Sequence, residues 1–492
     1  MDNSIWSYTK LPHFEAQSGN INCDVLIVGA GLCGLVCAYE LAESGVDPQN
    51  IVLTDAHRLF SGSSVRATAK LTSQHGIIYQ DISGKFGEDA AKQYADANEK
   101  AIRRAFEIAE KLSIGDAITP RTACLYAKNE QELLKLQKEQ LAASKAGIKC
   151  EITRECELPF DVKGVLAFFD QAAINPSLYA LAIINYLSDK GCRIYENTAA
   201  LSIENDAVIT DKGKIFAKKT VISTRFPFVD KRGLYFVKLY QQRAYLLAVE
   251  GAPKLNNMYI GIGQDSLTFR QAGDLLIFGG KASRNGNSYS QFFELIGIAS
   301  ELFPGCGVVE KWSNEDVITH DRIPYIGVNE HIPGTYIASG FGMWGMSTSF
   351  AAGKMLSDLI THGFCENSAL FSPSRSVAKA GKRSFFINAA EIAGEFAQVL
   401  DVPEKSLAQI ERGEGCIAAA GKRKLGAYRG NDGRLRLVVP TCSHMKCALR
   451  WNREEHCWDC PCHGSRFDTN GDVISGPAMK SIKFYNKSKT IE

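Results

Sequence analysis

The chain has 492 residues, of which 45% are hydrophobic and 22% are charged, and its formal net charge is +2. This composition is typical of a globular protein with roughly two to four domains, and it excludes a mostly disordered chain. No apolar run approaches the roughly 20 residues that span a bilayer, and residues 1–17 lack the features of a signal peptide. Without a signal peptide, we expect a cytoplasmic location. Nucleic acid is not an expected partner, because the basic residues are scattered.

The first predicted elements form a strand, a helix and a second strand. Residues 23–28 are a short apolar run, residues 33–44 carry apolar positions at helical spacing, and residues 51–54 form another apolar run that ends at Asp55. This order predicts the first βαβ unit of a doubly wound fold.

The turn of this unit reads G-x-G-x-x-G at Gly29, Gly31 and Gly34. In such a turn the first glycine permits a tight bend, the second lets a pyrophosphate approach the backbone, and the third lets helix and strand pack closely. Asp55 follows 21 residues after Gly34, where a carboxylate can accept hydrogen bonds from a ribose. The unit therefore predicts a dinucleotide site.

The following segments predict a mixed α/β domain. Residues 233–320 alternate aromatic and β-branched positions, which predicts an antiparallel sheet that covers the substrate. The remaining expected elements are helices at about 87–112, 129–147, 176–190 and 348–361 and strands at about 192–204, 207–210, 219–224 and 335–339.

A second G-x-G-x-x-G string occurs at Gly340, Gly342 and Gly345. A separate nicotinamide site is the alternative interpretation, but no second strand with a terminal acid follows, and Trp344 would crowd a phosphate turn. We interpret the string as a helix N-terminus aimed at the redox ring of the first cofactor, where its positive end would stabilise a reduced, anionic flavin.

Near the end of the chain, a C-x-H motif and a C-x-x-H motif are separated by fifteen residues. Two Cys and two His in this order are typical of a Rieske [2Fe–2S] centre, in which two imidazoles replace two thiolates on one iron. Zinc is the alternative, because Cys457 and Cys460 form C-x-x-C, but a zinc ribbon needs two paired knuckles. We treat Cys457 and His456 as non-ligands. The predicted ligands are Cys442, His444, Cys460 and His463.

Four segments of the chain resemble one known family. They are Val25 to Gly34, the loop 61–70 with its continuation to Gly76, Arg322 to Gly327, and Gly340 to Met346. Together they resemble the D-amino-acid-oxidase-type FAD-dependent oxidoreductases, which include glycine and sarcosine oxidases, and in particular a bacterial branch that carries a C-terminal Rieske domain. The likeness covers nearly the whole chain in order.

The resemblance implies FAD and a [2Fe–2S] cluster as cofactors. Two departures are Asp55, where the family more often has Glu, and Ser63-Ser64-Val65, where related chains usually read Thr-Thr-Gly. By resemblance the FAD-binding residues are Gly29, Ala30, Gly31, Gly34, Asp55, Ala56, Arg58, Ser63, Ser64, Arg66, Thr68, Lys70, Gly340, Phe341, Gly342, Trp344, Gly345 and Met346.

The resemblance also implies the domain organisation, an α/β two-domain fold. A doubly wound, Rossmann-like FAD domain with an antiparallel substrate subdomain occupies residues 1–370, a helical linker residues 371–403, and a small all-β Rieske domain residues 404–492. Within the first domain we expect nucleotide-binding parts at about 20–80, 170–230 and 320–362, and the substrate subdomain at about 85–165 and 233–320. Cys447 and Cys462 stand where higher-potential Rieske proteins form a disulfide, and Ser465 where they carry a hydroxyl that hydrogen-bonds the cluster.

The expected function is the oxidation of a C–N bond in an amino acid or secondary amine. A neighbouring cluster can take electrons from a flavin one at a time, so a dehydrogenase is favoured over an oxidase, with an unidentified one-electron acceptor or donor as partner. One alternative is an electron-transfer reductase component that serves a partner enzyme, and another is a redox sensor.

The catalytic residue is not identified by the sequence. His75 ends the flavin loop, Arg243 and Arg270 could clamp a substrate carboxylate, and Trp344 lies in the second glycine loop. Structural or surface roles are the alternative for each of them. Tyr240 and Tyr245 could line the substrate pocket, although aromatic alternation also serves core packing.

Overall fold

The computed structural model describes residues 4–229, 232–263, 266–284, 291–375, 405–421 and 423–485. We call residues 4–375 the large domain and residues 405–485 the small domain. Of the predicted helical linker at 371–403, residues 376–403 lie outside the described residues. Within the described ranges, no helix is both long and apolar enough to cross a membrane.

The first sheet of the large domain is built around β1 (Ile21–Val28), which is almost wholly apolar and buried along its second half. β1 runs parallel to both of its neighbours, and its second half is buried on both faces, as is usual in parallel sheets. The sheet order is β16 (Tyr325–Val328), β17 (Thr335–Ser339), β10 (Lys214–Ile222), β1, β2 (Ile51–Thr54) and β7 (Arg193–Tyr195), with β9 (Ala207–Thr210) and β8 (Ala200–Glu204) attached beside β10.

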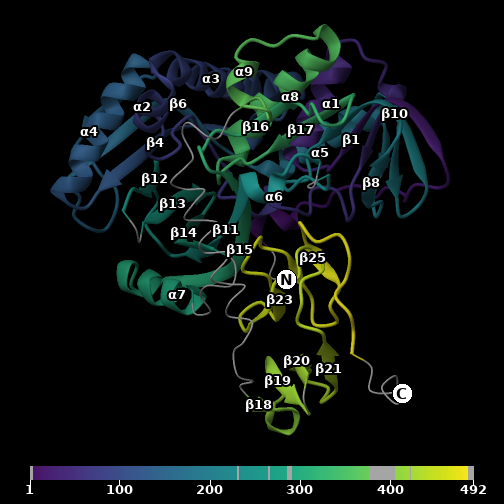
Figure 1. Ribbon diagram of the computed structural model, residues 1–492. Helices are drawn as coiled ribbons and strands as arrows, with labels where there is room; N and C mark the ends of the chain where they lie inside the picture. Colours follow the sequence, from purple (N-terminus) through teal and green to yellow (C-terminus); the bar gives the residue numbers. More distant parts are fainter. Residues whose placement is uncertain are drawn as a thin grey trace.

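Helices α1 (Leu32–Glu43), α5 (Pro176–Asp189) and α8 (Gly345–His362) pack on this sheet and on one another (Figure 1). The contact of α1 with α8 is close, because a Cβ added at Gly353 would lie 2.6 Å from a methyl carbon of Val36. Helix α8 corresponds to the helix predicted at 348–361, but it begins three residues earlier, directly after the second glycine loop.

The second sheet forms the other half of the large domain. Its strands pair antiparallel as predicted, except that β12 runs parallel to β4, which a long connection between two strands permits. The sheet order is β15 (Gly307–Thr319), β11 (Leu239–Glu250), β14 (Leu275–Arg284), β13 (Leu267–Ala272), β12 (Met258–Gly261), β4 (Ile118–Ala127), β6 (Gly164–Ile174) and β3 (Lys70–Leu71), with β5 (Cys150–Thr153) beside β6.

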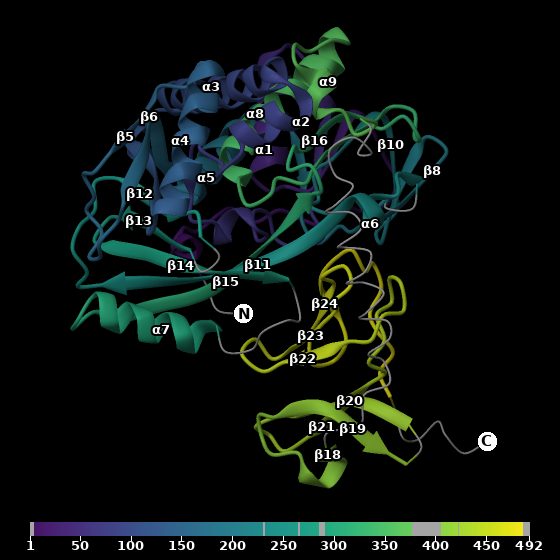
Figure 2. The same ribbon diagram turned by 60° about the vertical axis from the view of Figure 1, so that its left-hand side comes forward.

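Helices also cover the second sheet (Figure 2). The helix α7 packs Phe292 and Leu295 against Tyr245 and Leu247 of β11. The remaining helices of the large domain, in the described ranges, are α2 (Tyr79–Phe86), α3 (Glu88–Lys111), α4 (Glu130–Lys145), α6 (Tyr235–Lys238), α7 (Gln291–Leu302) and α9 (Ser368–Phe371).

The small domain consists of two small sheets, and both figures place β22–β25 against the large domain and β18–β21 farther from it. Its core contains Trp451 and Trp458, whose ring centroids are 4.8 Å apart. The strands are β18 (Lys405–Ser406), β19 (Gly415–Ala420), β20 (Arg423–Arg429), β21 (Leu435–Val438), β22 (Arg450–Asn452), β23 (Cys457–Asp459), β24 (Arg466–Phe467) and β25 (Val473–Ser475).

Candidate functional site

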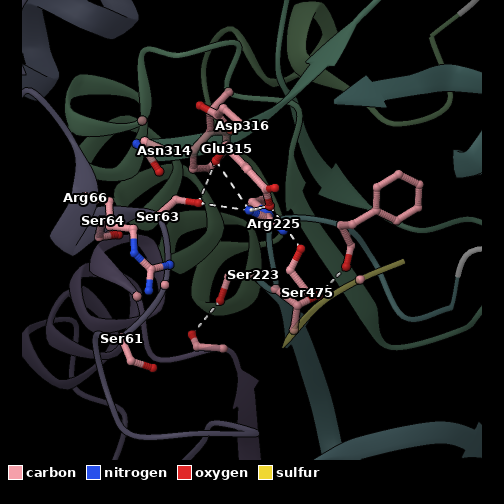
Figure 3. A pocket seen from close by; sticks show the side chains of 18 of the residues that line it. Ser61, Ser63, Ser64, Arg66, Ser223, Arg225, Asn314, Glu315, Asp316 and Ser475 are labelled. Atoms are coloured by element: carbon pink, nitrogen blue, oxygen red, sulfur yellow. Dashed lines mark hydrogen bonds and ion pairs between the residues drawn. The ribbon is translucent and has the colours of Figure 1, made fainter. Parts of the chain in front are cut away.

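A cavity of about 800 Å³ lies where β1 and β10 end at their carboxyl edges, the usual position of a ligand in a doubly wound sheet. Figure 3 shows that its wall comes from many segments, including the loop at Ser61–Arg66, Ser223, Arg225 and the strand residues Asn314–Asp316. Ser475 of the small domain also belongs to this wall. The cavity is therefore shared by the two domains.

The glycine turn after β1 forms one end of the cavity. Gly29 has φ +101°, and a Cβ added there would lie 2.8 Å from the carbonyl oxygen of Ser223. A Cβ at Gly34 would overlap the carbonyl oxygen of Gly29, whereas at Gly31 it would meet only the Ser64 hydroxyl, at 3.3 Å. Gly31 and the N-terminus of α1 thus border open space, so this cradle fits a pyrophosphate.

Replacing Gly34 with Ala should destabilise the large domain by about 3 kcal/mol or more, because the added methyl group meets backbone that has no room to move. Thermal unfolding and FAD content of the purified protein would measure this effect. Gly84→Ala is the matched control, since Gly84 is exposed in α2 with no atom near its Cβ position. The control should be neutral or stabilising by up to about 1 kcal/mol.

Asp55 connects the glycine turn to the loop after β2. Its carboxylate accepts hydrogen bonds from the backbone N–H groups of Ala30 at 2.9 Å and His57 at 3.0 Å. Burial raises the pKa of Asp55 above its usual value, which these two hydrogen bonds oppose. Ala56 and Arg58 line the same end of the cavity.

The loop at 61–70 forms a side of the cavity and is held by polar contacts. Ser64 Oγ accepts a hydrogen bond from Leu32 N at 3.1 Å, and Ser63 Oγ donates to the carbonyl oxygen of Glu315 at 2.7 Å. Lys70 donates to the carbonyl oxygen of Tyr259 at 2.6 Å, and burial lowers the pKa of Lys70 to about 7. Arg66 and Thr68 also line the cavity.

The second glycine loop forms the opposite side. Gly340, Gly342 and Met343 all have positive φ, and Asp316 accepts a hydrogen bond from Met343 N at 2.7 Å. Helix α8 begins directly after this loop, at Gly345. Asp316 therefore holds the loop in place, and burial raises the pKa of its carboxyl group to about 6.

The candidate His75 lies behind this loop, outside the set of described residues that line the cavity. Its ring stacks on Trp344 with 4.8 Å between centroids, and its Nδ1 lies 2.6 Å from the hydroxyl of Tyr94. Burial lowers the pKa of His75 to about 3, so the ring is neutral. We interpret His75 as a positioning residue for Trp344, which does line the cavity.

The other candidates are also held by protein groups. Arg270 donates to the carbonyl oxygens of Thr68 and Ile174, stacks over Trp6, and lines a separate cavity of about 440 Å³. Tyr240 stacks on the ring of His320, and Tyr245 packs edge-on against Phe292.

Arg243 is buried at the contact between the domains, with side chains that we call the interdomain ion network. Arg243 contacts carboxylate oxygens of Glu315 at 2.8 Å, Glu455 at 2.6 Å and Asp459 at 3.0 Å. Arg466 contacts the same three acids at 3.3, 3.0 and 3.1 Å. The network consists of Arg225, Arg243 and Glu315 from the large domain and Glu455, Asp459 and Arg466 from the small domain.

The four predicted cluster ligands come together in the small domain. Cys442 and Cys460 are fully buried, and a hydrogen bond between their thiols lowers the pKa of Cys442. The imidazole rings of His444 and His463 lie edge to face with centroids 5.1 Å apart. Two thiols beside two imidazoles are the donor set of a Rieske cluster.

The surroundings of His463 show whether a [2Fe–2S] cluster fits these residues. Its Nδ1 is buried and has no hydrogen-bond partner among the described residues. Burial lowers the pKa of His463 to about 3, so the ring is in the neutral form that binds a metal. By contrast, Cys457 lies 2.9 Å from Arg466 Nη2, and His456 stacks on Trp451, so both have other contacts.

The large domain touches the cluster site directly. The ring of Phe236, in α6, meets the rings of His444 and His463 edge-on, with centroids 6.5 and 6.2 Å apart. The segment Ser475 to Met479 lines the shared cavity, and within it Ala478 N donates to Ser465 Oγ at 3.0 Å. One segment therefore contacts both the cavity and the cluster loops.

Several wall residues were missed by the sequence analysis, namely Ser223, Arg225, Asn314, Glu315 and Asp316. The signal that could have found the last two was an adjacent pair of acids directly before the buried end of a strand, because buried charges need a partner or a function. No sequence signal indicated that the small domain completes the cavity.

Comparisons with protein families agree with this division of the chain. The family model for FAD-dependent oxidoreductases (DAO) matches residues 24–359, and the model for the Rieske [2Fe–2S] domain matches residues 398–486. A putative Rieske 2Fe-2S iron-sulfur protein, YhfW of Bacillus subtilis, is 34% identical over 491 residues, which is 96% of each chain. The gamma-glutamylputrescine oxidoreductase of Escherichia coli is 25% identical over 46% of this chain and 54% of its own length.

Solved structures share the fold of the large domain. L-proline dehydrogenase from P. horikoshii has a TM-score of 0.61 at 17% identity, and the match covers 72% of this chain and 98% of that one. Glycine oxidase from Geobacillus kaustophilus has a TM-score of 0.61 at 19% identity, covering 72% of this chain and 99% of that one. Together with the family models, these matches confirm the predicted fold class and the two cofactors.

Proposed function

This chain belongs to the FAD-dependent oxidoreductase (DAO) family and carries a C-terminal Rieske [2Fe–2S] domain, and from that premise we propose that it oxidises a C–N bond and passes the electrons to its own cluster. The substrate is an amine or an amino acid, in keeping with the names of the relatives and structural neighbours. The enzyme works as a dehydrogenase, with a separate one-electron carrier as the final acceptor.

The observation that carries this proposal is the segment Ser475–Met479. It lines the cavity that holds the glycine turn, and it hydrogen-bonds the loop of Ser465 beside Cys442. A path between the two cofactor sites through this segment crosses only a few residues of packed protein. In an oxidase without a cluster, this part of the cavity wall would have no redox role.

When bound, FAD would supply the two-electron chemistry for the oxidation of a C–N bond, and the cluster would supply one-electron transfer. The chain's own residues bind and orient both groups. Gly31 and the α1 N-terminus face the pyrophosphate, Asp55 the ribose, and the second glycine loop the ring. We propose the other FAD-binding residues implied by the family resemblance as contacts of the same cofactor.

In the small domain, Cys442 and Cys460 hold one iron, and His444 and His463 hold the other. Cys447 and Cys462, whose Cα atoms are 6.5 Å apart, form a disulfide that ties the two cluster loops together. Mass spectrometry of the unreduced, alkylated protein would detect this crosslink as a single peptide pair.

The test is anaerobic mixing of the loaded protein with a panel of amines and amino acids. We expect one compound to bleach the flavin absorbance band, followed by the signal of the reduced cluster in the same sample. Bleaching without cluster reduction would contradict the electron route. Reduction only by a reduced carrier protein would contradict the assigned substrate class.

A further inference from the structure

The arginines that could bind a substrate carboxylate are not available in the shared cavity. Arg243 is enclosed by three carboxylates of the interdomain ion network, and Arg270 lines the other cavity. Each cationic side chain that lines the shared cavity, within the described residues, has an interaction of its own. These are Arg58 with Glu196, Arg66 attracted by the charge of Glu315, Lys70 with Tyr259, Arg225 with Glu315, and Arg466 with Asp459.

Two polar side chains of β15, in contrast, line the cavity and have acceptor atoms that are not fully used. Asn314 and Asp316 are two residues apart on β15, so their side chains project from the same face of the strand, and both line the cavity (Figure 3). The side-chain oxygen Oδ1 of Asn314 is buried and has no hydrogen-bond partner among the described residues.

The Asp316 carboxylate has unused acceptor capacity as well. It accepts hydrogen bonds from Val317 N and Met343 N, both at 2.7 Å, and a carboxylate offers about four lone-pair sites. Its neighbour Glu315 is instead committed to Arg225, Arg243 and Arg466. Asp316 is therefore a negative charge at the second glycine loop, the side of the cavity that we assign to the flavin ring.

We propose, building on the proposed function, that the substrate is a cationic amine with no carboxylate beside its reacting carbon, and that Asp316 and Asn314 bind its ammonium group. An ammonium group supplies only donors, and the Asp316 carboxylate and the Oδ1 of Asn314 are both acceptors. An α-amino acid would instead place its carboxylate near that of Asp316, where the two like charges would repel each other.

Two probes of similar size and opposite charge test this proposal with the FAD-loaded protein. tert-Butylammonium, which cannot be oxidised at its quaternary carbon, and trimethylacetate would each be titrated while the flavin absorbance spectrum is recorded. We expect the cation to perturb the spectrum at a concentration at least about tenfold lower than the anion, because a buried charge pair contributes at least that factor. This measurement uses the wild-type chain and needs no variant to fold.

The variant Asp316→Asn keeps an acceptor for Met343 N and removes the charge. It should weaken tert-butylammonium binding about tenfold and raise KM for an amine substrate, with little change in trimethylacetate binding. The matched control is Asp274→Asn, at an exposed residue paired with Lys254, which should change neither affinity.

In the same flavin-bleaching screen, we expect amines that lack a carboxylate to react and the corresponding α-amino acids to remain inert. If amino acids bleach the flavin and trimethylacetate is the tighter probe, the present inference is wrong while the proposed function stands. If no compound of either class bleaches the flavin of the loaded protein, the proposed function fails and this inference falls with it.

Discussion

Replacing His463 with Asn should abolish the [2Fe–2S] cluster while leaving the flavin in place. The imidazole Nδ1 of His463 is buried without a partner among the described residues, so its loss removes a proposed metal ligand and no other polar contact of that nitrogen. Mutation of groups that only support ligands already costs about 10–100-fold in metal affinity, and loss of a ligand costs more. Iron and sulfide content and the cluster's electron paramagnetic resonance signal would measure the effect.

The same variant separates the two halves of the proposed reaction. We expect substrate to bleach the flavin in His463→Asn as it does in the wild type, whereas reduction of a one-electron acceptor protein should fall by at least about tenfold. His456→Asn is the matched control, because His456 is exposed in the neighbouring loop at φ +48°, which Asn tolerates. Undiminished acceptor reduction without a cluster would show that electrons leave the flavin by another route.

The parts of this site that sequence could predict are those encoded by short spacing. The glycine turn with Asp55 and the four cluster ligands are sets of residues that a tight turn or a pair of adjacent loops brings together. Local geometry alone then fixes their chemistry, whatever the rest of the fold does. The first βαβ unit was predictable for the same reason, since β1, α1 and β2 follow one another directly.

Other features depend on contacts between distant segments. Arg243 and Asp459 are separated by 216 positions, and only the docking of the small domain turns a candidate substrate clamp into the centre of an ion network. Asp316 is recognised as a cavity residue only in the folded chain, where β15 places it beside the loop of Met343. The parallel pairing of β12 with β4 likewise depends on how the whole second sheet assembles.

Replacing Arg243 with Met should release the small domain from the large one. Arg243 is 1% exposed and contacts three carboxylates, so its removal leaves Glu315, Glu455 and Asp459 with too little positive charge around them. Removing one partner from a buried ion pair costs about 3–5 kcal/mol, which is comparable to the stability of a domain contact. Hydrogen exchange of β11, β15 and β23 and small-angle scattering would report the separation.

The electron route gives this variant a second readout. If the contact through Ser475–Met479 carries electrons from cavity to cluster, Arg243→Met should slow cluster reduction while flavin bleaching by substrate continues. Adding Asp459→Asn restores equal numbers of positive and negative charges in the network, so the double variant should recover part of the loss.

The comparison that decides the role of the network is with an exposed ion pair. Arg436 pairs with Asp432 at 3.5 Å within the small domain, and Arg436→Met should cost less than about 1 kcal/mol and leave cluster reduction unchanged. Equal behaviour of the two arginine variants would mean that the interdomain ion network does not hold the domains together. The opposite result would be slow reduction of the cluster in Arg243→Met alone, with normal iron content. It would show that a fixed docking geometry connects two-electron oxidation in the large domain to one-electron transfer in the small one.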